Sequence, residues 1–430
     1  MVASLRLPSC LAFLSVRFTA SHLVFMLTAG VLCALGVAFI YSAGYLGEAY
    51  AVRGNYLRQC VFIGAGLVAG AGICALSPGR LSWRAVIFSG YFASLLLLVA
   101  VLLWGKSIGG ARRWIPVGGM LLQPAEFARV FTLLAGALLW DGKSLPRRWE
   151  LPLGLLCYLA PMALIAAEPS YGNAASLAIP LAVTLGLRYL PPWLWKISLL
   201  TMAGALLAAT LCVQHLRRQA AIPPAEKGAA GASLLPPKAA ALLKGYHLRR
   251  FQSFLSADGG WNEQQAVMAV AGGGRTGKGY LNGTMKNLGF LPRTVAPTDF
   301  IFAVVAEEGG FFFGVLPLLG LYWLLLMLPL HWASRAEDRL RLNLLAAGTT
   351  LLFTHVVVGV GMSVRLLPVI GLPLPLLSYG GSFTLSLFLL LGAMLAADRH
   401  PAEGTDTTPQ ETETGFRLGR LFRLRLRIQP

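Results

Sequence analysis

Residues 22–43 read HLVFMLTAGVLCALGVAFIYSA and contain no Asp, Glu, Lys or Arg. A helix of about 20 apolar residues crosses the roughly 30 Å of hydrocarbon in a bilayer. The stretch therefore predicts a transmembrane helix, which we place at 22–45. Residues 58–77 form a second stretch of the same kind, with one charged residue at its start.

The rest of the chain repeats this pattern. Of its 430 residues, 56% are hydrophobic and only 13% are charged, whereas a soluble domain has about 25% charged residues. One or two such stretches could be buried core helices, but this many predict an all-α integral membrane protein with about ten transmembrane helices. The predicted spans are 22–45, 58–77, 84–104, 123–140, 151–167, 172–187, 194–213, 300–329, 342–363 and 376–397.

The net charge of +18 could suggest nucleic acid as a partner. The basic residues instead gather in the short loops that are cytoplasmic if ten spans are counted from a cytoplasmic N-terminus. Arg147, Arg148 and Arg339 are examples. This bias orients membrane proteins, so it explains the charge without nucleic acid.

The same count gives the domain organisation. Residues 1–398 form one polytopic membrane domain, with a long extracytoplasmic loop at 214–299. Residues 399–430 are rich in Thr, Glu and Arg and are expected to form a cytoplasmic tail without a packed core. The six cysteines lie in or beside apolar spans, without the spacing of a metal site, and are expected to be small buried hydrophobic residues.

Ionisable residues in membrane segments are functional candidates, because burying them is costly. One group lies in GGARRWIPVGGMLLQPAEFARV, residues 109–130. Its glycines and proline predict a compact turn, followed by a helix from Gln123-Pro124. Glu126 and Arg129 are three residues apart and share a helical face. They form either a structural ion pair or part of a site. The adjacent Arg112 and Arg113 are unusual in a short external loop.

A second group surrounds the point where the chain re-enters the membrane, FLPRTVAPTDFIFAVVAEEGG at 290–310. Asp299 is at this boundary, where a carboxylate is partly removed from water and can act as a base. Pro297-Thr298-Asp299 would equally suit a helix cap. Glu307 and Glu308 follow two turns deeper.

Two further stretches contain unusual backbone. Residues 272–278 have the G-x4-G-K spacing of a nucleotide-binding loop, but Gly279 follows where Ser or Thr is needed. Lys278 could still contact another phosphate. Residues 365–382, RLLPVIGLPLPLLSYGGS, contain three prolines and three glycines and cannot form a regular helix. Such backbone is tolerated at membrane depth where it lines a cavity, so it is expected to help form a site.

Together, GARRW, QPAE, GKGYLNGT, TDFIFAVVAEE and LPLPLLSYGGS, in this order, resemble the SEDS family of shape, elongation, division and sporulation proteins. The resemblance covers roughly residues 20–398. It implies a ten-helix peptidoglycan glycosyltransferase that polymerises lipid II. It also implies a multi-pass protein of the bacterial inner membrane with an extracytoplasmic active face. The implied partners are a class B penicillin-binding protein and other elongation-complex proteins.

The resemblance also assigns residues. The family's essential aspartate corresponds to Asp299, the expected general base, and its helical Glu and Lys pair to Glu126 and Arg129. The other expected substrate contacts are Arg112, Arg113, Lys278, Arg365, Ser378 and Tyr379. No tightly bound cofactor is expected, although a divalent cation, Mg²⁺ or Mn²⁺, could help to hold the leaving pyrophosphate.

Several positions depart from the family pattern. Arg129 replaces Lys, Ser170 replaces an acid in the Pro-Asp-x-Gly-Thr motif, Asn173 replaces its Thr, and Arg365 replaces a glycine. The stretches GxxxxLxFLP and LPVIGLPLPL favour the elongation branch, typified by RodA, over the division branch, typified by FtsW. A lipid II flippase, or a scaffold that activates a partner synthase, are the alternatives from other classes.

Overall fold

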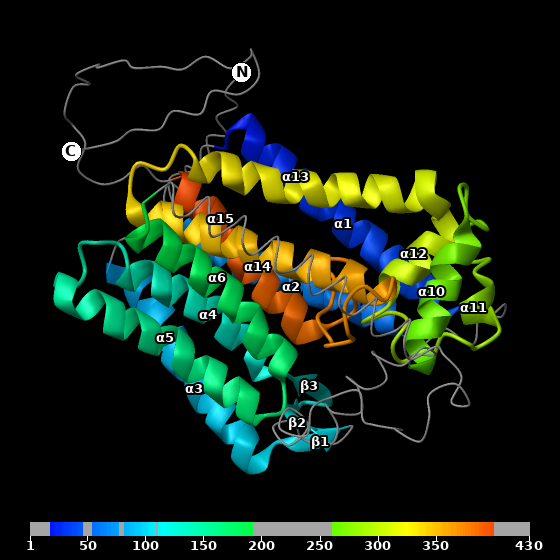
Figure 1. The fold of residues 1–430 in the computed structure, drawn as a ribbon, viewed down its shortest axis with the longest axis horizontal. Coiled ribbons are helices and arrows are strands. Elements are labelled where there is room, and N and C mark those ends of the chain that lie inside the picture. Colours follow the sequence, from blue (N-terminus) through cyan, green and yellow to red (C-terminus); the bar gives the residue numbers. More distant parts are fainter. Residues whose placement is uncertain (1–17, 46–53, 77–80, 109–110, 192–259, 400–430) are drawn as a thin grey trace, which may run out of the picture.

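The computed structural model describes residues 18–45, 54–76, 81–108, 111–191 and 260–399, which form a helix bundle (Figure 1). In chain order the helices are α1 (Ala20–Gly44), α2 (Asn55–Ala75), α3 (Leu81–Trp104), α4 (Pro124–Leu139), α5 (Arg147–Ala167), α6 (Tyr171–Tyr189), α10 (Trp261–Gly273), α11 (Thr284–Asn287), α12 (Ile301–Gly309), the π-helix η4 (Gly310–Val315), α13 (Leu316–Ala333), α14 (Arg339–Ser363) and α15 (Gly381–Arg399).

The helices confirm the predicted membrane fold. Within the described residues, seven helical stretches are long and apolar enough to cross a membrane. Helices α4 and α6 are not among them, and α4 has only 16 residues, but both coincide with predicted spans. The predicted span 194–213, most of the predicted loop and the tail 400–430 lie outside the described residues.

Helices α14 and α15 form the interior of the bundle. In their most apolar 18 residues, 72% and 78% are buried, against 28% in α2 and α3. Helix α15 packs closely against α2 through small residues, because a Cβ on Gly392 would collide with the carbonyl oxygen of Gly70. Small residues allow such close backbone approach between membrane helices.

The chain between α14 and α15, residues 364–380, is irregular; we call it the linking segment. The predicted span 376–397 was therefore wrong for residues 376–380, since α15 begins at Gly381. Arg365 and Leu376 have positive φ angles of 56° and 63°. Helix α1 approaches the segment closely: a Cβ on Gly36 would lie 2.6 Å from the carbonyl oxygen of Leu376.

A small antiparallel sheet interrupts the all-α pattern after α3. It consists of β1 (Lys106–Ile108), β2 (Ala111–Val117) and β3 (Met120–Leu122), in the order β1-β2-β3. Ser107 pairs with Arg112, and Val117 with Met120. The expected compact turn is confined to Gly118 and Gly119, whose φ angles are 55° and 79°. The sheet ends at Gln123, where α4 begins with Pro124 at its first turn.

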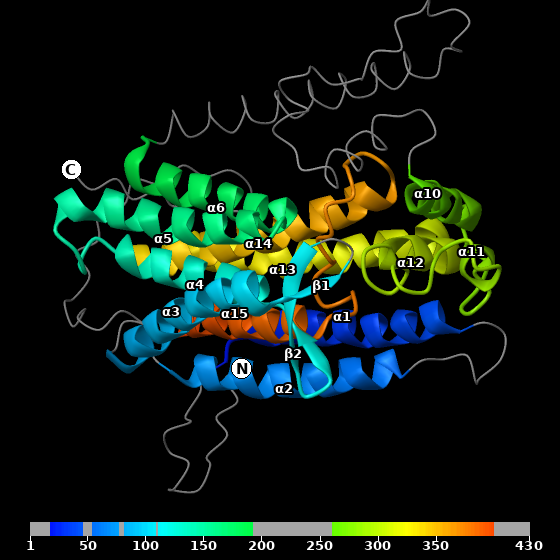
Figure 2. The same cartoon turned by 90° about the horizontal axis from the view of Figure 1, so that it is seen from below.

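Helices α10 and α11 lie together at one end of the bundle beside α12 (Figures 1 and 2). The predicted span 300–329 is divided by Gly310, which has a φ angle of 66° and ends α12. The backbone N–H groups of Phe311 and Phe312 donate to the carbonyl groups of Gly274 and Arg275, each at 3.0 Å. These two hydrogen bonds attach the glycine-rich loop after α10 to the start of η4, where α12 ends.

Candidate active site

Asp299 lies in the turn immediately before α12, and its side chain is half-buried. The N-cap residue of α12 is Phe300, one position after Asp299. The turn is held from the linking segment. The Tyr379 N–H donates to the Pro297 carbonyl at 2.8 Å, and the Ser378 hydroxyl donates to the Thr298 carbonyl at 2.7 Å. Three predicted site residues therefore come together, with Ser378 and Tyr379 holding the backbone that carries Asp299.

The linking segment is itself held by side chains from three helices. His355 of α14 bonds the Pro373 carbonyl at 2.9 Å, and the Tyr322 hydroxyl of α13 donates to the Pro375 carbonyl at 2.9 Å. Gln59 of α2 accepts from the Gly380 N–H at 3.2 Å. These bonds satisfy backbone groups that have no helical partner because the segment is irregular.

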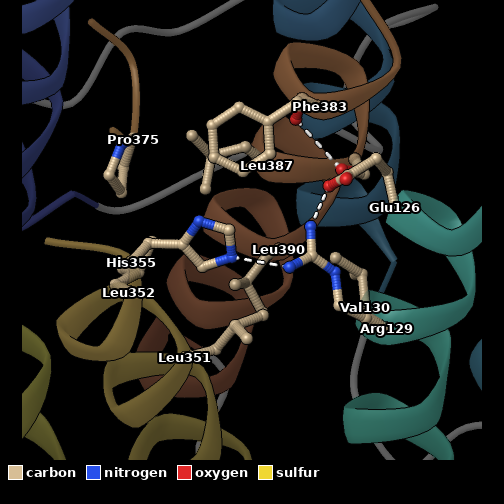
Figure 3. A pocket seen from close by; sticks show the side chains of 11 residues that line it. Glu126, Arg129, Val130, Leu351, Leu352, His355, Pro375, Phe383, Leu387 and Leu390 are labelled. Carbon is tan, nitrogen blue, oxygen red and sulfur yellow. Dashed lines mark hydrogen bonds and ion pairs between the residues drawn. The ribbon is translucent and has the colours of Figure 1, made fainter. Parts of the chain in front are cut away.

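Glu126 and Arg129 form a buried ion pair on α4, as their spacing predicted; their side chains are 5% and 2% exposed. Arg129 also contacts the Nε2 atom of His355 at 2.7 Å and donates to the Ser176 hydroxyl at 3.2 Å. Glu126, Arg129 and His355, with apolar side chains such as Phe383 and Leu387, line a pocket between α4, α14 and α15 (Figure 3). The pair therefore connects three helices in the interior of the bundle.

Lys278 is paired within the protein. Its Nζ lies 2.7 Å from Glu307 Oε1 and 2.5 Å from the Thr284 hydroxyl. Next to it, the buried Lys286 Nζ lies 2.7 Å from Glu308 Oε1. Burial lowers the pKa of Lys286, and Glu308 opposes this shift. The two pairs fasten the chain between α10 and α12 to the end of α12.

The two arginines of β2 have different surroundings. Arg112 is exposed, whereas Arg113 is half-buried and donates to the Pro169 carbonyl. The neighbouring Glu168, between α5 and α6, is fully buried, and neither of its carboxylate oxygens has a hydrogen-bond partner in the described part of the chain. Burial raises the pKa of Glu168 to about 8, and Arg113 opposes the shift.

The remaining predicted residue, Arg365, is the second residue after α14, near the start of the linking segment. Its Nε lies 3.9 Å from Glu263 Oε2 on α10. The positive φ angle of 56° at Arg365 explains why glycine is usual at this position. Within the described ranges, no three His, Cys, Asp or Glu side chains gather as a metal site would require.

Sequence reasoning missed the residues that support the site from within the spans. Gln59, Tyr322 and His355 each bind backbone of the linking segment. The signal was present for His355, an ionisable residue in the apolar span 342–363, because such residues are functional candidates. Gln59 and Tyr322 gave no comparable signal, since their partners are backbone groups distant in the sequence.

Comparisons with known proteins agree with this architecture. Residues 22–403 match the FTSW_RODA_SPOVE family of cell cycle proteins. The peptidoglycan glycosyltransferase RodA of Treponema pallidum is 30% identical, over 86% of this chain and 96% of its own. A probable peptidoglycan glycosyltransferase FtsW of Mycobacterium bovis is also 30% identical, over 91% of this chain and 70% of its own.

A solved structure has the same fold. It is described as the structural coordination of polymerization and crosslinking by a peptidoglycan synthase complex, and its matching chain is 29% identical. The match has a TM-score of 0.64 and covers 89% of this chain and 98% of the other. The expectation of a glycosyltransferase is confirmed by these relatives. The chain is a multi-pass membrane protein and belongs to the FtsW, RodA and SpoVE family of cell cycle proteins.

Proposed function

We propose that this chain polymerises the glycan strands of peptidoglycan from lipid II, with Asp299 as the general base. The observation that carries the proposal is the double support of the Asp299 turn by Ser378 and Tyr379. The Asp299 side chain is neither fully buried nor fully exposed. A base on a fixed backbone and partly removed from water suits proton abstraction from a sugar hydroxyl.

In the proposed reaction, the 4-hydroxyl oxygen of one sugar attacks C1 of another. The bond between C1 and the lipid pyrophosphate oxygen breaks, and the pyrophosphate leaves with the electron pair. Asp299 accepts the hydroxyl proton as the glycosidic bond forms. A single displacement inverts the configuration at C1. General-base catalysis of this kind contributes about 10²–10⁴-fold to a rate.

The leaving pyrophosphate needs positive charge. We assign this role to Arg112, which is exposed on β2, and to Arg365 of the linking segment, whose Nε lies 3.9 Å from Glu263 Oε2, a longer separation than the 2.7 Å between Lys278 and Glu307. Lys278 and Arg113 are engaged with Glu307 and the Pro169 carbonyl, so we assign them to holding the surrounding loops. A divalent cation would depend on the substrate's own phosphates, and no step is assigned to it.

Within the family, we propose side-wall elongation rather than division. The sequences GTMKNLGFLP at 283–292 and LPVIGLPLPL at 367–376 resemble the RodA branch. Overall identity does not separate the branches, because relatives of both names are 30% identical. In this role the chain acts at the outer face of the bacterial inner membrane, beside a class B penicillin-binding protein and other elongation-complex proteins.

The proposal is tested with purified protein and lipid II, with and without the cognate transpeptidase, by resolving glycan products on gels. Wild-type protein should produce polymer, and Asp299→Ala should produce almost none. A parallel assay follows movement of lipid II between the leaflets of vesicles. If the wild type moves lipid II between leaflets but makes no polymer, the proposed polymerase function is wrong and a flippase function is supported.

A further inference from the structure

The buried ion pair on α4 needs an explanation beyond stability. Glu126 and Arg129 are almost completely removed from water. Burying two charges is costly, and in many proteins an apolar pair of similar size replaces such an ion pair without loss of stability. We therefore expect the pair to have a second role, and Arg129 contacts one further side chain of interest, that of His355.

The pair determines the hydrogen-bonding state of His355. Arginine remains charged and can only donate hydrogen bonds. The Nε2 atom of His355, 2.7 Å from Arg129 Nη1, must therefore accept. The remaining ring proton is then on Nδ1, which donates to the Pro373 carbonyl at 2.9 Å. A fixed tautomer of this kind is how one partner of a histidine orients the other.

Hydrogen bonds continue from Pro373 to the Asp299 turn. The next residue, Leu374, donates its N–H to the Ser378 hydroxyl at 2.9 Å. The same hydroxyl donates to the Thr298 carbonyl at 2.7 Å, which is the bond adjacent to Asp299. The hydrogen bonds are short, between 2.7 and 2.9 Å, and are buried or partly buried. The prolines at 373 and 375 limit the alternative backbone conformations between them.

We propose that His355 is a positioning residue that transmits the geometry of the Glu126 and Arg129 pair, through Pro373 and Ser378, to Asp299. The inference rests on the proposed function for the catalytic role of Asp299. The connection between His355 and the backbone of the Asp299 turn does not depend on that role. His355 is 2% exposed, and the hydrogen bonds described above connect it to the Asp299 turn through the linking segment.

The main test compares His355→Leu with a matched control, Asn343→Leu. Asn343 also lies on α14 and donates to a buried carbonyl, that of Trp140, at 3.0 Å. Both variants lose one side-chain bond to backbone, and His355→Leu also loses the contact with Arg129. Of the two residues, His355 is the one that bonds the linking segment. Hydrogen exchange should become at least about 10-fold faster in peptides covering 374–380 and 298–303 of His355→Leu, and should stay unchanged there in Asn343→Leu.

Kinetics give the second measurement. Displacing a reacting group by about 1 Å can cost about 100-fold in rate, so His355→Leu should lose at least about 10-fold in kcat while KM changes less than about 3-fold. His355→Gln can both donate to Pro373 and accept from Arg129, and should restore most of the kcat. Asn343→Leu should keep its kcat.

The outcomes separate this inference from the proposed function. If wild-type protein makes no polymer, the proposed function fails. The hydrogen-exchange measurement then tests by itself whether His355 positions the Asp299 turn. Unchanged exchange at 298–303 in His355→Leu, or an equal increase in Asn343→Leu, would overturn the role of His355. If His355→Leu does not fold, Ser378→Ala removes the last step of the same path and should show the same exchange and kcat changes; unchanged values would overturn the proposal equally.

Discussion

The two ends of the bundle both hold buried charged side chains, but these are satisfied in different ways. At the end where α4 finishes, Asp141 accepts from the N–H groups of Lys143 and Ser144, each at 2.7 Å, and from Arg84 at 3.2 Å. At the other end, the Asp299 turn is supported by the linking segment, in which Ser378 lies 80 residues further along the chain than its partner Thr298. We call these the Asp141 end and the Asp299 end.

The difference indicates which polar residues serve the fold and which serve the site. Asp141 is satisfied mainly by groups next to it in the chain, the N–H groups of Lys143 and Ser144 and the Ser144 hydroxyl, as is common for an aspartate in a turn. Bonds at the Asp299 end connect α4, α14 and the linking segment to one short turn. Long-range support of an acid-bearing turn is typical of a preorganised active site.

The largest predicted effect on stability contrasts two arginines. Removing one partner of a fully buried pair costs roughly 3–5 kcal/mol, because a buried charge is left uncompensated. Arg129→Met should show a loss of this size. Arg84→Met should cost about 1 kcal/mol or less, since Arg84 is 34% exposed and Asp141 keeps its backbone donors. Chemical unfolding in detergent measures the free energy of unfolding of both variants. Equal losses would contradict the predicted difference between the Asp299 end and the Asp141 end.

Glu168 predicts a pH-dependent stability at the Asp299 end. Its pKa is about 8 when folded, above the ordinary value of 4.5. The folded state therefore retains a proton that the unfolded state releases. This contribution is complete below pH 4.5 and is lost as the pH rises to about 8, by at most about 1.4 kcal/mol per pH unit.

Glu168→Gln should remove this part of the pH dependence. At pH 8 its free energy of unfolding should be higher than that of the wild type. Glu150→Gln is the matched control at the other end of α5. It breaks the 2.5 Å pair with Arg188 and should lower stability instead. A wild-type profile that is flat between pH 5 and 8 would contradict the assignment of Glu168.

The smallest predicted effect concerns exposed basic residues. Arg112→Ala should raise KM for lipid II about 10-fold, the value of one charge-assisted hydrogen bond, and leave unfolding unchanged. Lys143→Ala, an exposed basic residue at the Asp141 end, should leave KM unchanged. Steady-state kinetics measure KM for lipid II in both variants. Equal KM values would contradict substrate binding by Arg112 and leave it a role in membrane topology alone.

Much of the fold was predictable because membrane helices are determined by local hydrophobicity. The predicted spans on described residues coincide with helices to within a few residues. The sheet at 106–122 was missed, since glycines and a proline in ARRWIPVGG suggested a turn rather than strands. The error at 376–380 had the opposite origin. These residues, LLSYG, carry no charge and continue into an apolar stretch, but the preceding Pro373 and Pro375 and long-range hydrogen bonds keep them out of the helix.

The site was predictable only in part. Asp299, Glu126 and Arg129 were recognisable as charges at or in apolar segments, and motif resemblance indicated Ser378 and Tyr379. Sequence could not indicate that Ser378 bonds Thr298 or that His355 connects Arg129 with Pro373, because these partners are between 18 and 226 residues apart. Such pairs become visible only when the helices are packed.

The central claim, that Asp299 is the catalytic base, is tested most directly by the same substitution at two half-buried aspartates. Asp338 is the N-cap of α14 and accepts from the Arg341 N–H at 2.7 Å. Asn caps a helix about as well as Asp, so Asp338→Asn should polymerise lipid II within about 3-fold of wild type. Asp299→Asn cannot accept the proton and should be slower by about 100-fold or more. Substantial polymer from a folded Asp299→Asn protein would contradict the claim.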